Sequence, residues 1–475
     1  METDIENLEN VLNLPPNSII VACAASQLTE ASNGFSSSLY QLNVQWKLKE
    51  PHGEFLRPDD DAYSLNKAPS LADPKDVAEA ATKSTGVMKH IAELDADSTS
   101  VVPAAAASTS NNNNAASRDT DRSGEINLIV KRMPNRSQWI SLNSEATFEK
   151  ELNMYSLLVP SYDEILDQLS RKLYLEDSTI QSNQHNHLFP KFLGGRLNLK
   201  NSPDYVDEHA VILLENLKRS GYENCRDSNL DMSHFIAVLT RLAVFHAAGI
   251  IIRHDQKYKT TFKNLLKTSR PFFFGAKDKD IELINSRRRE ATMETVKKFN
   301  YDETFNVKLM NILEQTDKKT LPSPETCYSS LLHNDLWVNN IMFKYPDDSK
   351  EVEDKGKDEI KDVKFIDLQN TNFGSVAKDF VLLMYTSVDQ SAWAYLDMFT
   401  LYYHEILVGN LAKYFGDHFV RQYSLDRFRD ELKTYACHKF KHIFNVLKQR
   451  YGENIDLYEE HLECILDHCI QYDFI

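Results

Sequence analysis

The sequence predicts an α+β fold with a strand-rich first half and a helix-rich second half. Residues 36–48 alternate apolar and polar side chains in a β-rich composition, and residues 126–131 form a second apolar run. Alternation of this kind is typical of half-buried strands. After Asn216 the apolar residues recur at spacings of three and four, which indicates amphipathic helices.

The remaining elements follow in chain order. A helical pattern runs from Asn143 to Pro160. Short apolar runs predict further strands at residues 188–193, 210–214, 340–345 and 363–367. One apolar face of a helix covers residues 235–249, and helical patterns continue after Asp379 to the end of the chain.

Two segments interrupt this pattern. Residues 51–125 contain alanine runs, a Ser/Thr stretch and four consecutive asparagines, and residues 346–363 are strongly charged. The first segment cannot bury enough apolar surface to offset the entropy of ordering it, so we expect a disordered insertion between two strands. The chain is therefore divided into a first part, residues 1–215, and a second part, residues 216–475.

The negative charge of the chain is concentrated in these insertions. The net charge is −16, of which −6 falls in residues 51–125 and −4 in residues 346–363, so the rest of the chain carries only −6. An acidic chain is a poor candidate for binding nucleic acid or an anionic membrane through its overall field. The chain outside the two insertions is nearly balanced in charge, so it could bind an anionic ligand through a local positive charge such as a lysine or a metal ion.

The N-terminus and the cysteines predict a cytoplasmic protein. The acidic first residues lack the basic region and the apolar stretch of a secretory signal. The 6 cysteines are scattered without a CxxC pair, which is typical of reduced thiols. The apolar run at 235–252 is interrupted by Arg241 and His246 and falls short of the roughly 20 apolar residues that span a bilayer, so no membrane insertion is expected.

The most informative segment is residues 331–345, which contains the pattern H-x-D-L-x-x-x-N at His333, Asp335 and Asn340. Further along, an apolar run ends in Asp367. Phosphoryl transfer needs one carboxylate to orient or deprotonate the attacking hydroxyl, and an amide oxygen and a second carboxylate to hold Mg²⁺ against the nucleotide phosphates. The alternative, in which the acid caps a turn and the amide is incidental, is disfavoured because apolar strands flank both polar clusters in the right order.

Phosphoryl transfer from ATP also needs a lysine on a strand and a helical glutamate that holds this lysine. Lys131 ends the second apolar run, and Glu151 lies in the helical stretch that follows. Glu149 competes with Glu151, but Glu151 lies on the same helix face as Phe148, Leu152 and Tyr155 and so points inward. A strand-end lysine is usually solvent-exposed, and Lys131 becomes a candidate only in company with the downstream residues.

The glycine loop that would hold the phosphates is thin. Residues 32–38 contain Gly34 and Ser36 but no G-x-G-x-x-G pattern. Small residues and backbone N–H groups can still form an anion-binding nest, which makes Gly34 and Ser36 candidate nucleotide contacts. The simpler interpretation is that the Asn-Gly pair is a turn.

Taken together, these residues resemble the ecdysteroid kinase-like proteins of arthropods, a choline-kinase-like branch of the protein-kinase-like fold. The resemblance rests on four motifs and on the Lys131 strand with the helix at 148–155. The motifs are HNDLWVNNI at 333–341, IDLQ at 366–369, LLENLKRSGY at 213–222 and LAVFHA at 242–247.

The resemblance implies a protein-kinase-like two-lobe fold. The N-lobe, residues 1–215, would be an antiparallel sheet plus a helix and would contain the low-complexity, disordered insertion 51–125. The C-lobe, residues 216–475, would be mostly helical, with the catalytic loop at 331–345 and the charged insertion at 346–363.

The activity that the resemblance implies is ATP- and Mg²⁺-dependent phosphorylation of a hydroxyl group on a small lipophilic molecule, an ecdysteroid or a hydroxylated xenobiotic. It implies that Asp335 is the catalytic base, with His333 beside it among the catalytic residues, and that Asn340 and Asp367 are the metal ligands.

The resemblance also implies a nucleotide site. Lys131 and Glu151 would position the phosphates. Glu215 and Leu217, at the passage from a strand to the hinge, would meet the adenine. A catalytically silent nucleotide-binding pseudokinase or scaffold is the alternative, which the thin glycine loop favours. A protein kinase is disfavoured because no Ala-Pro-Glu segment follows Asp367.

Four further features carry expectations. His246 should be a hydrogen-bonded core residue, and His333 should stabilise its loop by hydrogen bonding rather than transfer protons. Asp379 either anchors the backbone of the catalytic loop or caps a helix. A set of aromatic residues at helical spacing should belong to the core, with a pocket for a flat apolar substrate as the less favoured alternative: Trp393, Tyr395, Phe399, Tyr402 and Tyr403.

Overall fold

The computed structural model describes residues 8–12, 14, 18–29, 38–48, 123–134, 144–176, 187–268, 278–317, 326–346 and 360–475. The chain divides into two compact units. Unit 1 comprises residues 1–30, 38–133 and 193–214, and unit 2 comprises residues 31–37, 134–192 and 215–475. One boundary lies at residue 215, and the helical residues 144–176 belong to unit 2. Most of the segments 51–125 and 346–363 lie outside the described residues.

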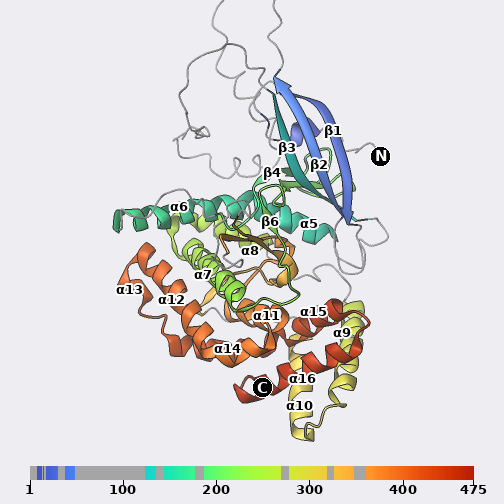
Figure 1. Ribbon diagram of the computed structural model, residues 1–475, viewed down its shortest axis with the longest axis vertical. Helices are drawn as coiled ribbons and strands as arrows, with labels where there is room; N and C mark the ends of the chain where they lie inside the picture. Colours follow the sequence, from blue (N-terminus) through green and yellow to red (C-terminus); the bar gives the residue numbers. More distant parts are fainter. Residues whose placement is uncertain are drawn as a thin grey trace, which may run out of the picture. The chain divides into compact units, whose positions relative to one another are not determined.

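Unit 1 is built on a five-stranded sheet with the order β1-β2-β3-β5-β4. Figure 1 shows β1, β2 and β3 side by side. Strand β2 pairs antiparallel with both β1 and β3. A short helix, α1 (Leu8–Val11), accompanies the sheet. The strands are β1 (Ser18–Thr29), β2 (Ser38–Leu48), β3 (Ser123–Arg132), β4 (Phe192–Arg196) and β5 (Val211–Glu215).

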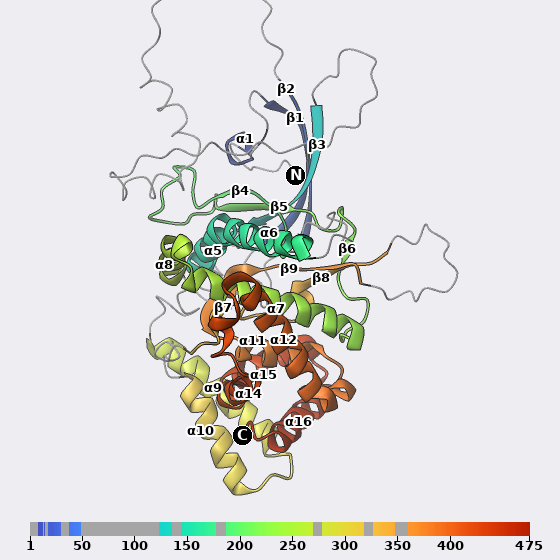
Figure 2. The same cartoon turned by 90° about the vertical axis from the view of Figure 1, so that its left-hand side faces the viewer.

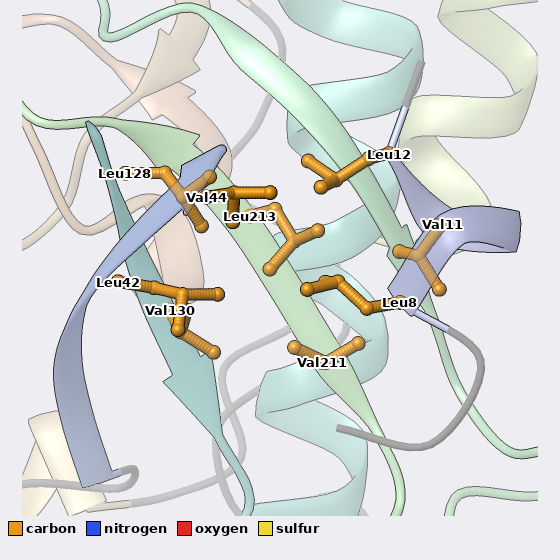
Figure 3. Close-up of a cluster of buried hydrophobic side chains, with 9 residues drawn as sticks. All are labelled: Leu8, Val11, Leu12, Leu42, Val44, Leu128, Val130, Val211 and Leu213. Carbon is orange, nitrogen blue, oxygen red and sulfur yellow. The ribbon is translucent and has the colours of Figure 1, made fainter. Parts of the chain in front are cut away.

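The core of unit 1 lies on one face of this sheet. Leu42 of β2 stands opposite Leu128 of β3, and both side chains are fully buried. Figure 3 shows the side chains from α1, β2, β3 and β5 that pack together: Leu8, Val11, Leu12, Leu42, Val44, Leu128, Val130, Val211 and Leu213. The two strands predicted from alternation are therefore confirmed, and their apolar faces form the core.

Unit 2 is mostly helical, which confirms the predicted α+β class. Its longer helices are α5 (Ser144–Asn153), α6 (Val159–Glu176), α7 (Met232–His254), α8 (Lys259–Thr268), α9 (Asp278–Val296), α10 (Glu303–Asp317), α11 (Ala377–Ser387), α12 (Leu396–Phe415), α14 (Leu425–Tyr435), α15 (Phe440–Tyr451) and α16 (Ile455–Gln471). Its strands are β6 (Tyr222–Glu223), β7 (Ser329–Leu332), β8 (Ile341–Lys344), β9 (Asp362–Phe365) and β10 (Asn372–Ser375).

The helix predicted to end at Pro160 continues to Glu176. Between α5 and α6 the chain makes a π-helical turn, Met154–Leu158. Pro160 therefore falls in the first turn of α6. A proline is tolerated there because the wide turn already interrupts the regular hydrogen-bond ladder. The prediction treated the proline as a stop and missed this turn.

The strand predicted at residues 188–193 is displaced, because β4 begins only at Phe192. Leu188 and Phe189 are buried in unit 2 instead, where the backbone N–H of Phe365 donates to the carbonyl oxygen of Leu188 at 2.8 Å. Lys364 Nζ donates to the carbonyl oxygen of Phe189 at 3.1 Å. The apolar run thus reflects burial beneath β9 rather than a strand of its own.

Helix α7 is the central helix of unit 2 and lies along β7 and α12 (Figure 2). It is longer than the predicted stretch, and among the described residues it is the one helix long and apolar enough to cross a membrane, with a mean hydropathy of 2.1. The expectation that no apolar run reaches this length was therefore wrong. In the structure, 72% of the apolar window is buried, as in the core helix of a folded unit.

The close approach of α7 to β7 depends on Gly249. A Cβ atom at this position would lie 2.2 Å from Ser330 Oγ and 3.0 Å from the backbone nitrogen of Leu331. Ser330 Oγ itself donates to the carbonyl oxygen of His246 in α7 at 2.8 Å. Since β7 leads directly into the loop at residues 333–340, this contact sets the position of the loop relative to the core helix.

Candidate active site

The segment with the H-x-D-L-x-x-x-N pattern is a loop between two buried strands. All four residues of β7 are buried, and β7 pairs antiparallel with β10. After the loop, a short 3-10 turn, Val338–Asn340, leads into β8, which pairs antiparallel with β9. The predicted strands at 340–345 and 363–367 are thus confirmed as the hairpin β8–β9.

Asp379 holds the backbone of this loop from the core. Its carboxylate accepts the backbone N–H of His333 at 2.6 Å and that of Asn334 at 2.9 Å. The helix that contains it, α11, has Val376 as its N-cap. Of the two roles considered for Asp379, loop anchor and helix cap, the structure shows the anchor.

A buried histidine supports this anchor. His246 is fully buried, its Nε2 lies 3.3 Å from Asp379 Oδ2, and the hydroxyl of Tyr403 lies 2.5 Å from its Nδ1. Burial raises the pKa of Asp379, but the hydrogen bond and charge of His246 and the charge of Lys439 outweigh it and hold this pKa below its usual value. His246 is therefore a hydrogen-bonded core residue, as predicted.

His333 joins the loop to the segment that contains Asp367. Its side chain is fully buried, and its Nε2 donates to the carbonyl oxygen of Ile366 at 2.9 Å. The backbone N–H of Ile366 in turn donates to the carbonyl oxygen of Asn340 at 3.0 Å. The two halves of the predicted phosphoryl-transfer motif are thus connected by hydrogen bonds.

Asp335 is held by a hydrogen bond on each carboxylate oxygen. Asn370 Nδ2 donates to Oδ2 at 3.0 Å, and His442 Nε2 lies 3.0 Å from Oδ1. Burial raises the pKa of Asp335, but the hydrogen bond and charge of His442, the charge of His333 and the hydrogen bond of Asn370 outweigh it and lower the pKa. The carboxylate is therefore ionised and fixed in direction near neutral pH.

Asn340 and Asp367 offer oxygen ligands to a cation. Asn340 Nδ2 donates to the carbonyl oxygen of Asp335 at 2.8 Å, which turns the amide so that its oxygen is the atom left for a ligand. Asp367 has a left-handed backbone, with φ 67°. Strained backbone of this kind is concentrated at functional sites.

These two residues fit a magnesium site better than a protein-enclosed metal site. Among the residues that the structure describes, no group of three or more His, Cys, Asp or Glu side chains is arranged to hold a metal. Mg²⁺ prefers oxygen ligands and usually takes only one or two carboxylates from the protein, with phosphates and water completing the octahedron. An amide oxygen and one carboxylate are a suitable protein contribution.

The helical glutamate approaches the Asp367 segment. Glu151 is 1% exposed, whereas Glu149 is exposed, so the inward direction predicted for Glu151 is confirmed. Helix α5 packs against the turn after Asp367. Burial raises the pKa of Tyr155, and the negative charges of Glu151 and Asp367 raise it further, which places both carboxylates near this phenol.

The other candidate nucleotide residues lie on β3 and in the segment between β1 and β2. Lys131 lies in unit 1 near the end of β3, opposite Leu39, and its side chain is buried. Gly34 and Ser36 lie outside the described residues, in the segment that joins β1 to β2.

The predicted hinge residues lie beside the hairpin β8–β9. Leu217 is buried and packs with Tyr222 and Met342, and Ile366 packs against the same cluster. The carboxylate of Glu215 accepts a hydrogen bond from Ser220 Oγ at 2.6 Å. Leu217 therefore belongs to a small apolar cluster that adjoins Asp367 through Ile366, while the side chain of Glu215 is engaged within the hinge.

Sequence reasoning missed three residues around Asp335. Asn370 lies three positions after Asp367, so the continuation of the IDLQ motif could have indicated it. His442 and Lys439 come from the C-terminal helices, and His442 is separated from Asp335 by 107 residues. No local pattern marks them, because only the packing of α15 brings them to the loop.

The aromatic residues predicted for the core divide into two sets. Trp393, Phe399 and Tyr403 are buried, but Tyr395 and Tyr402 are 52% and 36% exposed. The prediction is therefore correct for three residues and wrong for two, since helical spacing alone does not show how wide the buried face is.

The model of one protein family, described as the ecdysteroid kinase-like family, matches residues 100–415, which include the whole loop and the Asp367 segment. The chain belongs to the ecdysteroid kinase-like family. This confirms the resemblance drawn from the motifs, and with it the protein-kinase-like fold. The chain is accordingly a small-molecule kinase, a phosphotransferase. A comparison with curated proteins gives no significant match.

Two solved structures are similar to the chain. One is an ethanolamine kinase from Plasmodium vivax, with 12% identity over 72% of this chain and 76% of that chain and a TM-score of 0.35. The other is a choline kinase from Cryptosporidium parvum Iowa II, with 9% identity over 95% of this chain and 91% of that chain and a TM-score of 0.38. At these TM-scores, neither similarity supports a conclusion about this chain.

Proposed function

We propose that the chain transfers the γ-phosphoryl group of ATP, with Mg²⁺, to a hydroxyl group of a small lipophilic molecule. The observation that carries this proposal is the hydrogen-bonded arrangement of Asp335, Asn340 and the Asp367 segment around one loop. Each has the chemical group that the reaction needs, and each is held in a defined direction.

The proposed role of Asp335 is to orient the acceptor hydroxyl and to accept its proton. Its pKa is lowered, so the carboxylate is available as an acceptor at neutral pH. The basicity of such a carboxylate contributes little to the rate of phosphoryl transfer. The carboxylate contributes mainly by positioning, because phosphoryl transfer has a loose transition state with little covalent chemistry for the protein to perform.

The proposed role of Asn340 and Asp367 is to hold the metal ion. Bound Mg²⁺ would neutralise charge on the phosphates of ATP. Glu151 and Lys131 are proposed to position these phosphates, and Leu217 to contact the adenine. Gly34 and Ser36 are proposed as phosphate contacts from the segment between β1 and β2.

The proposed substrate class is an ecdysteroid or a hydroxylated xenobiotic, and membership of the family supports it. The acidic composition supports neither nucleic acid nor an anionic membrane as a partner. A cytoplasmic location stays a prediction.

The test is a screen of hydroxylated lipophilic compounds, ecdysteroids included, for a gain in mass of one phosphate that depends on both ATP and Mg²⁺. We expect at least one compound class to be phosphorylated. Mg²⁺-dependent ATP binding without phosphorylation of any compound would instead favour the alternative of a catalytically silent nucleotide-binding protein.

A further inference from the structure

The C-terminal part of unit 2 reaches the catalytic loop through two side chains. The 3-10 turn η6 (Cys437–Lys439) and the start of α15 present Lys439 and His442 to this loop. Neither residue belongs to the motif that identifies the loop in the sequence.

Lys439 holds the residue that precedes Asp335. Its side chain is 4% exposed, and its ammonium group donates to the carbonyl oxygen of Asn334 at 3.1 Å and to Asn334 Oδ1 at 2.6 Å. Asn334 has a left-handed backbone, with φ 65°. Since Asp379 binds its N–H, this peptide is held from two sides.

His442 connects Lys439 to Asp335. Its Nδ1 lies 3.4 Å from Lys439 Nζ, and its Nε2 lies 3.0 Å from Asp335 Oδ1. An ammonium group can only donate, so Nδ1 must accept. The proton of a neutral imidazole then sits on Nε2 and is donated to Asp335.

Asp335 and His442 are partly exposed to solvent, whereas Lys439 is buried. The side chain of Asp335 is 16% exposed and that of His442 is 31% exposed, so both reach solvent, whereas Lys439 lies behind them. Helix α15 is also fixed next to His442, because Lys441 Nζ donates to Oδ1 of the buried Asn285 in α9 at 2.5 Å. The histidine is therefore presented by a helix that is held in place.

We propose that His442, supported by Lys439, is a positioning residue for the catalytic base. It fixes one oxygen of the Asp335 carboxylate while Asn370 fixes the other, so that the carboxylate faces the acceptor hydroxyl in one orientation. This inference rests on the proposed function. Loss of the hydrogen bond should slow turnover and leave nucleotide binding unchanged, because the hydrogen bonds of His442 within the described residues go to Lys439 and Asp335.

The test compares His442→Leu, which removes the donor, with His442→Gln, which keeps an N–H near the position of Nε2. The probe is Mg²⁺-dependent ATP hydrolysis, in which water takes the place of the acceptor. We expect His442→Leu to lower kcat by about 10- to 100-fold, with the KM for ATP changed by less than about two-fold, as for a loss of positioning. His442→Gln should restore kcat to within about three-fold of the parent value.

His438→Leu is the matched control, because His438 is exposed in the same segment and contacts the ring of Tyr435. It should leave kcat at the parent value. A parent kcat in His442→Leu, or an equal loss in His442→Gln, would show that the positioning role is wrong.

A second measurement separates this inference from the proposed function. In the full chain labelled with ¹⁵N-histidine, the His442 signals are assigned by their loss in His442→Gln. An Nε2–H tautomer that changes in Asp335→Asn supports the contact, and an Nδ1–H tautomer overturns it. If the parent protein shows no turnover of any kind, the proposed function fails, while this spectrum still decides on the contact.

Discussion

Asp379 is a buried carboxylate that binds two backbone N–H groups of the catalytic loop. Buried charges are tolerated only when they are paired and hydrogen-bonded. Here His246 and the loop supply the hydrogen bonds, and Lys439 supplies a nearby positive charge. Single buried contacts of this kind, rather than surface ion pairs, therefore fix where Asp335 lies.

We expect Asp379→Asn to lower the free energy of unfolding by about 2–4 kcal/mol, because two buried N–H groups lose a charged acceptor. Chemical denaturation measures the change. Asp397→Asn is the control, since the side chain of Asp397 is 75% exposed and should matter by less than about 0.5 kcal/mol. Equal stability of the two variants would contradict the anchoring role.

The lowered pKa of Lys439 predicts the direction in which the free energy of unfolding changes with pH. Burial lowers its pKa from 10.5 to about 8. Between these values the unfolded chain binds more protons than the folded chain, so the contribution of Lys439 to the free energy of unfolding rises with pH. The stability of the parent relative to Lys439→Met should therefore increase from about pH 8 to about pH 10. A difference that stays constant or falls over this range would show that the pKa is not lowered.

At the scale of elements, apolar patterns predicted several of the strands and helices that bury one face. The strands of the β8–β9 hairpin and of β2 and β3 were found from their apolar patterns. Strand β1 was missed because a run of apolar residues is followed by small ones, so no alternation is visible; its described side chains from Ala22 to Leu28 are mostly exposed. The continuation of the helix past Pro160 was missed because a π turn depends on backbone geometry that no residue pattern shows.

Replacing a helical glycine by alanine should change the stability of the protein in opposite directions at two positions, Gly249 at the contact between α7 and β7 and Gly409 in α12. Gly249→Ala should destabilise the protein by about 1–3 kcal/mol, because the new Cβ atom collides with Ser330 Oγ, which is held by a hydrogen bond to α7, and lies tight against the backbone nitrogen of Leu331. In Gly409→Ala, on α12, the new Cβ atom meets no atom of the described residues within 4 Å, so the change should stabilise the protein by about 0.5–1 kcal/mol through helix propensity. Thermal unfolding measures both changes. A stabilising Gly249→Ala would mean that the two elements are not in close contact.

At the scale of the whole molecule, local patterns predicted the catalytic motif and the helix-rich second part. They could not predict which C-terminal residues reach Asp335, because such contacts depend on how the helices pack. His442 is the clearest example. The sequence around it has the pattern of an ordinary amphipathic helix, and only the packing of the fold brings its side chain to the carboxylate of Asp335.

The proposed phosphoryl transfer depends most on Asp335, which orients the acceptor hydroxyl and accepts its proton. The direct measurement uses ATP labelled in the γ-phosphate and an acceptor identified by the screen, with the parent protein and Asp335→Asn side by side. We predict that Asp335→Asn binds Mg²⁺–ATP within about two-fold of the parent and transfers phosphate at least about 100-fold more slowly. Transfer by Asp335→Asn at the parent rate would contradict the account.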